Sequence, residues 1–486
     1  MHLIVAVILL FAQHEHHMIA SSDVGEVRFP SSCAPDAAKS VQSGVALLHS
    51  FWYDEAEKTF QQAIAQDKQC ALAYWGVAMT QYHPLWPQPV TPQSLQKASD
   101  ALATARALQN VPPRERAYVD ALSTFYGQPA GTSVHDRALA YEAAMAKLVA
   151  TYPDDDEAAI FYALSLNGSA LLTDKTYAKQ KQAAAILNRL LHGHPKHPDI
   201  IHYLIHSYDT PLLAPLALDA ARSYANIAPS VPHALHMPSH IFTRLGLWNE
   251  SIESNLRSRD AAKAHGDTGE QLHAMDYLEY AYLQLGRFDD AKRIVDELQA
   301  ATETAPIELK TTYAIAAIPA RFALERHDWR AASELNGGAK IDWNKTPRTA
   351  SLVEFTRGIG AARMGNIDRA KQSEQVLTAF VSSEKDPMWL ALLTSQQKSV
   401  AAWRLFAEGK RDDALAMMRA AADDEDRTEK PAVTPGALLP ARELLGDMLL
   451  EMNQRNAAAG EYKAVLAVAP NRRNAREGLT RASTQD

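Results

Sequence analysis

The chain has 486 residues, of which 47% are hydrophobic, and a formal net charge of −8. This length is enough for two or three ordinary domains or for one long repeat array. Because acidic and basic residues are interspersed and the balance is mildly acidic, the composition argues against a nucleic-acid partner. Glycine is sparse, with 21 residues, and strand-like alternation is hard to find, so we expect an almost entirely helical protein.

The first predicted element is a leader, residues 1–30, that contains the apolar run Leu3–Ala12. This run has the length of a signal-peptide core and is too short to span a bilayer. It lacks the basic residues that usually precede such a core, and a disordered tail or a mis-assigned start is the alternative interpretation. No later segment is apolar for long enough to be a transmembrane span. We therefore expect an exported protein, periplasmic or extracellular, without a membrane span.

Two cysteines, Cys33 and Cys70, follow the leader. In an exported protein they can form a disulfide that ties the segment before the first repeat to the start of the second. Two buried free thiols are an equally good interpretation. Neither cysteine has a histidine or cysteine neighbour at the spacing of metal ligands.

From Ala37 onward, small and aromatic residues recur at fixed positions. If Ala37 is position 1, they fall at positions 8, 17, 20, 24 and 27, namely Gly44, Tyr53, Ala56, Phe60 and Ala63. This pattern resembles the tetratricopeptide-repeat family, with degenerate repeats as in a bacterial-type exported member. The resemblance implies an all-α fold, a right-handed superhelical solenoid of antiparallel helix pairs. Small residues let the two helices of a pair approach closely, and aromatics fill the gap to the next pair.

The same template recurs to the end of the chain, with starts at residues 232, 272, 313, 351, 395 and 439. These starts are 38 to 44 residues apart, more than a standard repeat of about 34, so longer helices or loops are expected. We divide the solenoid into an N-terminal array, residues 35–270, which carries a histidine-rich groove, and a C-terminal array, residues 271–485. The acidic run Asp423–Asp426 is interpreted as a solvated linker.

Two His-x-x-x-His pairs, His202 with His206 and His236 with His240, lie in the N-terminal array. The pairs are offset by one repeat, because 236 − 202 = 34 and 240 − 206 = 34. Residues i and i+4 of a helix share one face, so each pair is predicted to be a two-imidazole clamp. The equal offset predicts that the two clamps lie on equivalent faces of neighbouring helices.

The family resemblance adds further candidates, since the first helix of each tetratricopeptide repeat lines the concave groove. The histidines at groove positions are candidate additional ligands: His273, His233, His83 and His49. The nearby carboxylates and a phenol are candidate fourth ligands or hydrogen-bond acceptors for the imidazoles: Asp209, Asp276, Glu279 and Tyr280. Arg321, at position 9 of its repeat, is a candidate for binding an anion in the groove.

Converging neutral imidazoles are typical of sites for Cu, Zn or Fe. Three histidines with an open position indicate a catalytic metal, and four indicate a structural one. The leading hypothesis is an exported solenoid that binds a transition metal in its groove, with metal-dependent hydrolase or oxidoreductase activity on a small molecule left open. The alternative is a non-enzymatic scaffold that binds a protein or peptide segment there. A buried histidine that only donates to a backbone carbonyl is the plainer interpretation of either pair.

Overall fold

The computed structural model describes residues 24–85, 90–303, 305–337 and 341–484. In these ranges every regular element is a helix and no strand occurs, so the all-α prediction is confirmed. None of the described helices is both long enough and apolar enough to cross a bilayer. Most of the predicted leader, including the apolar run Leu3–Ala12, lies outside the described residues.

The helices follow one another along the chain with short connections. The first half forms α1 (Pro35–His49), α2 (Tyr53–Gln66), α3 (Ala71–Met79), α4 (Pro92–Ala107), α5 (Pro113–Tyr126), α6 (Val134–Thr151), α7 (Asp156–Ser169), α8 (Ala178–Leu191), α9 (Pro198–Tyr208), η2 (Ala214–Ala217), α10 (Leu218–Tyr224), α11 (Pro232–His236) and α12 (Pro238–Arg244). The second half forms α13 (Trp248–His265), α14 (Thr268–Gln284), α15 (Phe288–Thr302), α16 (Leu309–Leu324), α17 (Trp329–Ser333), η3 (Trp343–Lys345), α18 (Pro347–Arg363), α19 (Ile367–Ser383), α20 (Pro387–Ala407), α21 (Arg411–Glu425), α22 (Ala441–Glu451), α23 (Arg455–Val468) and α24 (Arg473–Ser483).

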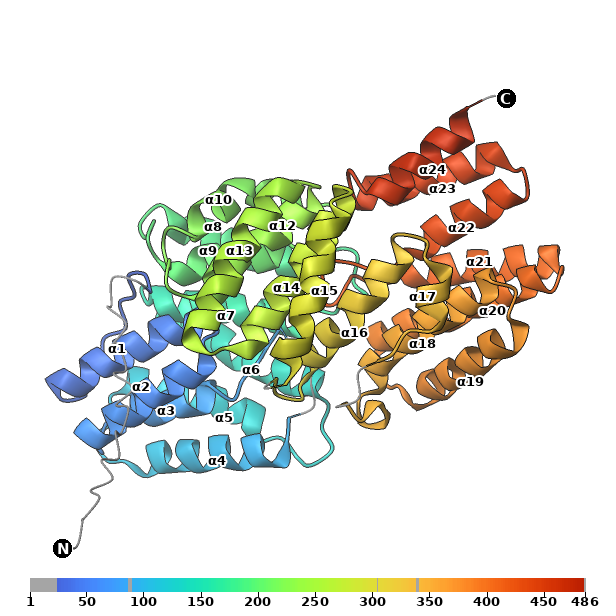
Figure 1. The fold of residues 1–486 in the computed structure, drawn as a ribbon. Helices are drawn as coiled ribbons and strands as arrows, with labels where there is room; N and C mark the ends of the chain where they lie inside the picture. Colours follow the sequence, from blue (N-terminus) through green and yellow to red (C-terminus); the bar gives the residue numbers. More distant parts are fainter. Residues whose placement is uncertain (1–23, 86–89, 304, 338–340, 485–486) are drawn as a thin grey trace, which may run out of the picture.

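The helices stack in chain order, from α1 at the blue end of the molecule to α24 at the red end (Figure 1). Most helices pack on the next helix in the chain, and several also pack on the next but one, as α1 does on α3, α7 on α9, α14 on α16 and α18 on α20. This is the packing of a helical-hairpin solenoid, in which each pair buries its apolar face against its neighbours. The buried apolar side chains accordingly form successive clusters along the described chain rather than one central core.

Glycines let aromatic rings pack closely against neighbouring helices, as the repeat pattern predicts. A Cβ added at Gly44 would lie 2.7 Å from the ring of Phe60, and one added at Gly76 would lie 2.3 Å from it. The ring is therefore held between a glycine of its own hairpin and a glycine of the next. Near the C-terminus Tyr462 has the same contact, since a Cβ at Gly478 would lie 2.4 Å from its ring. The tetratricopeptide-like packing is thus present at both ends of the solenoid.

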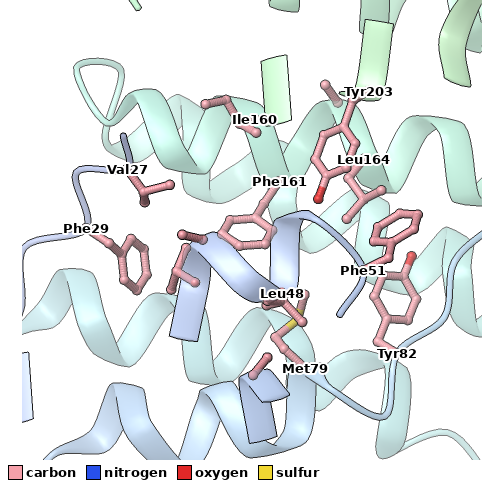
Figure 2. Packing of buried hydrophobic residues seen from close by; sticks show 14 of the residues in the cluster. Val27, Phe29, Leu48, Phe51, Met79, Tyr82, Ile160, Phe161, Leu164 and Tyr203 are labelled. Carbon is pink, nitrogen blue, oxygen red and sulfur yellow. The ribbon is translucent and has the colours of Figure 1, made fainter. Parts of the chain in front are cut away.

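The segment before α1 is packed against the first hairpins. Phe29 is 1% exposed, and its ring stacks on Trp75 with centroids 5.4 Å apart. Figure 2 shows Val27 and Phe29 lying beside Phe161 of α7. A disulfide joins Cys33 to the residue that precedes α3, Cys70, which decides between the two interpretations of these cysteines. The last residues of the predicted leader, 24–30, are therefore attached to the body of the solenoid.

Residues 427–440, between α21 and α22, cross to the N-terminal half, and we call them the crossing segment. The amide of Glu429 donates to the carbonyl of Leu172, 3.1 Å away. Apolar side chains of the segment are almost fully buried, with Val433 and Leu438 each 3% exposed. The segment therefore joins the C-terminal helices to the helices that carry the predicted histidine groove.

The prediction that Asp423–Asp426 forms a solvated linker is wrong. The run forms the last turn of α21 and the residue after it. Asp424 is 5% exposed and pairs with Lys398, so its charge is used inside the protein. A short acidic run does not reveal from sequence that one of its carboxylates faces a lysine of the neighbouring helix.

Candidate metal centre

The first histidine pair lies on α9. The Nε2 atoms of His202 and His206 are 3.0 Å apart, as the i, i+4 spacing on one helix face allows. The Nδ1 of His202 lies 2.7 Å from the carbonyl oxygen of His49. Because a carbonyl oxygen only accepts, Nδ1 carries the proton, and the lone pair of His202 is on Nε2. The Nε2 atom of His202 is thus prepared to accept a proton or a metal ion.

The second pair does not share one helix, and the prediction of a single helical clamp is wrong here. Helix α11 ends at His236 and α12 begins at Pro238, because proline has no N–H to continue the helical hydrogen bonds. Met237 between them still has helical dihedral angles, φ −53° and ψ −37°. Residues 236 and 240 therefore still lie one helical turn apart on the same face, and the Nε2 atoms of His236 and His240 are 3.0 Å apart.

Both rings of the second pair are oriented by acceptors at Nδ1. His236 Nδ1 lies 2.6 Å from Oδ1 of Asn255, whose Nδ2 donates to the carbonyl of Ser251 at 2.8 Å. The Asn255 oxygen is therefore the acceptor and His236 the donor. His240 Nδ1 lies 2.8 Å from a carboxylate oxygen of Asp209, which accepts from it.

The Asp209 carboxylate is ionised. Burial alone would raise its pKa, but Lys430 and Arg244 hold the pKa of Asp209 well below its usual range. With both Nδ1 atoms donating, the Nε2 lone pairs of His236 and His240 face each other across 3.0 Å with no proton between them. Such a contact between two lone pairs is repulsive by itself and becomes favourable when a cation lies between the two nitrogens. Metal-ligating histidines in general donate their other N–H to a carboxylate or carbonyl in this way.

A third histidine joins each pair. His233 of α11 lies with His202 and His206, and we call these three set one. His273 of α14 lies with His236 and His240, and we call these three set two. Within each set the potential ligand atoms all lie within 4.8 Å of one another. The four histidines predicted to form one site are thus divided between two sets of three, completed by two of the predicted additional ligands.

Five of the six imidazoles in the two sets have lowered pKa values. Burial lowers the pKa of His240 to about 4, and it lowers the pKa of four others well below the ordinary value: His202, His206, His236 and His273. Five of the six are almost fully buried, and His206 is partly exposed. Neutral imidazoles at pH 7 offer lone pairs to a metal without first losing a proton.

His49 and His83 are not brought into either set. The Nε2 of His49 contacts Glu157 at 3.1 Å, and its Nδ1 pairs with Asp199. Burial opposes protonation, but these carboxylates raise the pKa of His49 to about 9, so it is an imidazolium at neutral pH. The ring of His83 lies against that of Tyr53, tilted by 34°, with centroids 4.2 Å apart. His49 therefore touches set one only through its carbonyl, which orients His202.

The other predicted polar candidates form a separate buried ion cluster. Arg321 is 0% exposed and pairs with Asp276 and, at 3.3 Å, with Glu279. Its guanidinium also lies over the ring of Tyr280, 5.2 Å from the centroid. The charge of Arg321 is therefore neutralised within the protein. Of the predicted carboxylates, Asp209 contacts a histidine of the two sets, His240.

Three residues that orient the histidines were not predicted. Asn255 lies on α13, and Glu270 contacts Nδ1 of His233 at 3.2 Å from the first turn of α14. Lys430 of the crossing segment reaches Asp209 at 3.0 Å across 221 residues of sequence. None of the three follows from the spacing of the histidines. Tyr277, whose hydroxyl lies 3.3 Å from Nε2 of His240, is at position 6 of its repeat, which the family pattern could have indicated.

A cavity of about 820 Å³ lies beside the crossing segment. Helices from both halves of the solenoid line it, including Arg244, Tyr280, Leu352 and Trp389. Lys430 and Arg244, which line the cavity, both pair with Asp209. Because Asp209 also accepts from His240, these contacts connect the cavity wall to set two.

Fold and site together define an all-α solenoid of helical hairpins that contains two buried three-histidine sets. No protein-family model and no curated protein matches the chain. Similar solved structures include yeast Tom70, with 14% identity over 92% of this chain and 95% of that one, at a TM-score of 0.42. The Cut9–Hcn1 hetero-tetramer of APC/C has 11% identity over 96% of this chain and 79% of that one, at a TM-score of 0.41. The P58(IPK) TPR domain has 14% identity over 92% of this chain and 97% of that one, at a TM-score of 0.22. Likeness at this level carries no information about activity or partners.

Proposed function

We propose that this protein is an exported solenoid that binds a transition metal, Cu, Zn or Fe, through the histidines of sets one and two. The observation that carries the proposal is the contact between His236 and His240. Their Nε2 lone pairs lie 3.0 Å apart while each Nδ1 donates to an oxygen. For ligands about 2.1 Å from an ion, two nitrogens lie about 3.0 Å apart at a 90° angle and about 3.4 Å apart in a tetrahedron. The observed separation fits a shared cation.

The chemistry of the ligands favours a transition metal over Mg²⁺ or Ca²⁺. Those hard cations take oxygen ligands, whereas neutral imidazole suits Zn, Cu, Fe and Ni. A metal with three protein ligands keeps an open position, at which it can activate water or polarise a substrate. The proposal thus includes a metal-dependent hydrolase or oxidoreductase acting on a small molecule. Export is supported by the apolar run Leu3–Ala12 and by the Cys33–Cys70 disulfide, since disulfides persist in oxidising compartments.

The alternative function is a scaffold that binds a protein or peptide segment in the groove. The cavity beside the crossing segment is the feature that favours it, because apolar side chains such as Leu352 and Phe355 are among those that line it. The crossing segment, which consists mainly of turns and bends, also lines this cavity. A peptide partner would have to bind beside it or displace it. Metal binding requires no such rearrangement.

Metal analysis of the purified protein tests the proposal. The wild type is expected to contain stoichiometric transition metal, and a chelator should lower its melting temperature, because a ligand that binds only the folded state stabilises it. His236→Ala should lose bound metal. His192→Ala, which changes an exposed histidine outside both sets, is the matched control and should retain it. Metal absent from the wild type after incubation with Zn²⁺ or Cu²⁺, or unchanged by His236→Ala, would leave only the scaffold.

A further inference from the structure

The two histidine sets are copies of one arrangement. If Pro198 is position 1 of its repeat, His202 and His206 are at positions 5 and 9, and His233 is at position 2 of the next repeat, which starts at residue 232. Set two has the same composition, with His236 and His240 at positions 5 and 9 and His273 at position 2 of the repeat that follows. Each set is thus completed across a hairpin boundary in the same way. The next repeat has Asp276 and Tyr280 at positions 5 and 9, so the arrangement ends there.

The residues that orient the imidazoles are also matched between the sets. Each set has one histidine whose Nδ1 contacts a carboxylate: His233 with Glu270 at 3.2 Å and His240 with Asp209 at 2.8 Å. Each set has another, at position 5, whose Nδ1 donates to a neutral oxygen: His202 to the His49 carbonyl and His236 to Asn255. Each carboxylate is also paired with a lysine, Glu270 with Lys310 at 2.7 Å and Asp209 with Lys430 at 3.0 Å.

The two sets lie next to each other, since the rings of His206 and His240, one from each set, have centroids 6.0 Å apart, about as close as the 6.2 Å between His240 and His273 within set two. The positions of the potential ligand atoms distinguish the sets, because in the described part of the chain these nitrogens form two groups of three, each within 4.8 Å. An ion with ligands at about 2.1 Å spans nitrogens no more than about 4.2 Å apart. The ligand atoms of each set, within 4.8 Å of one another, need only small movements to reach that range, so each set can hold an ion of its own.

We propose that the protein binds two transition-metal ions per chain, one in each set, as a binuclear centre. This inference rests on the proposed function and specifies its stoichiometry. The three imidazoles of each set would hold one ion. Imidazoles bound to metal are uncharged and would leave the charge of two divalent ions uncompensated, and Asp209 and Glu270 are already paired with cationic side chains. A small anion bound together with the ions would reduce this charge, as the nucleophile or substrate does in two-metal enzymes.

The stoichiometry of Zn²⁺ binding tests the inference. Metal-free full-length protein titrated with Zn²⁺ is expected to bind two equivalents. His233→Asn should remove the equivalent of set one and His273→Asn that of set two, so each variant binds one and the double variant none. The control His192→Asn should still bind two. Circular dichroism and the unfolding midpoint check that each variant is folded. If a variant does not fold, His202→Asn replaces it for set one or His240→Asn for set two.

The outcomes separate this inference from the proposed function. One equivalent in the wild type, lost in both single variants, would mean that the sets share one ion; the inference would then be overturned while the metal-binding function stands. No binding to the wild type would overturn both. Two equivalents in the wild type and one in each folded single variant would establish the binuclear centre.

Discussion

Replacing Asn255 by alanine isolates the effect of orienting one imidazole. Asn255 is 0% exposed and accepts from His236 Nδ1 at 2.6 Å. Without this acceptor His236 can move its proton to Nε2, where it would donate to His240 Nε2 at 3.0 Å. A metal ion would then have to displace that proton. Loss of such an orienting partner typically lowers metal affinity 10- to 100-fold, or about 1.4 to 2.7 kcal/mol.

The same substitution also destabilises the metal-free protein, by about 1 to 3 kcal/mol, because it leaves the buried His236 Nδ1 without its partner. The two effects are separated by measuring the free energy of unfolding by urea with and without a fixed excess of Zn²⁺. The stabilisation that metal provides follows RT ln(1 + [L]/Kd), so it should fall by about 1.4 to 2.7 kcal/mol in Asn255→Ala.

Asn474→Ala is the matched control for this measurement. Asn474 is 4% exposed, donates to Glu325 at 2.9 Å and lies on α24, away from both histidine sets. It should lower the stability of the metal-free protein without changing the stabilisation by Zn²⁺. If Asn255→Ala and Asn474→Ala respond to Zn²⁺ equally, the hydrogen bond from His236 to Asn255 has no part in metal binding and the tautomer argument is refuted.

Three further predictions concern the frame around the site. His49 has a pKa of about 9 in the folded protein, against an ordinary value of 6.5 for histidine, so it stabilises the protein below about pH 6.5 and loses that contribution as the pH rises through about 9. The difference in free energy of unfolding between wild type and His49→Gln should therefore shrink by about 3 kcal/mol from pH 6 to pH 10. A difference that stays constant over this range would contradict the prediction. Cys33→Ser opens a disulfide that spans 37 residues and should cost about 2 to 4 kcal/mol in urea unfolding, matching the effect of a reductant on the wild type. Gly76→Ala places a Cβ against the ring of Phe60 and should destabilise the protein by about 1 to 3 kcal/mol. Gly460→Ala, in α23 with open space around it, is the control and should be neutral or stabilising. Equal effects of the two substitutions would mean that the Phe60 ring moves to make room for the added methyl group.

The sequence alone was sufficient for features that depend on neighbours along the chain. Helical class follows from the period of apolar and small residues, and the contact of Phe60 with Gly44 follows from a spacing within one hairpin. The His202–His206 pair is equally local, because one turn of helix brings residues i and i+4 together. Pro238 was visible in the sequence as a helix breaker, yet the pair around it was predicted as one helix.

Only the tertiary structure decided how the histidines are grouped and what holds them. The spacing of 34 residues suggested four histidines in one site, but the packing of consecutive hairpins completes each pair with a histidine from the following repeat. Asn255, Glu270 and Lys430 reach the histidines from other helices and from the crossing segment. Their positions depend on how hairpins stack in space, a long-range property that no local period encodes. Backbone hydrogen bonds between near neighbours set the helices, whereas the proton on each imidazole depends on residues that only folding brings into contact.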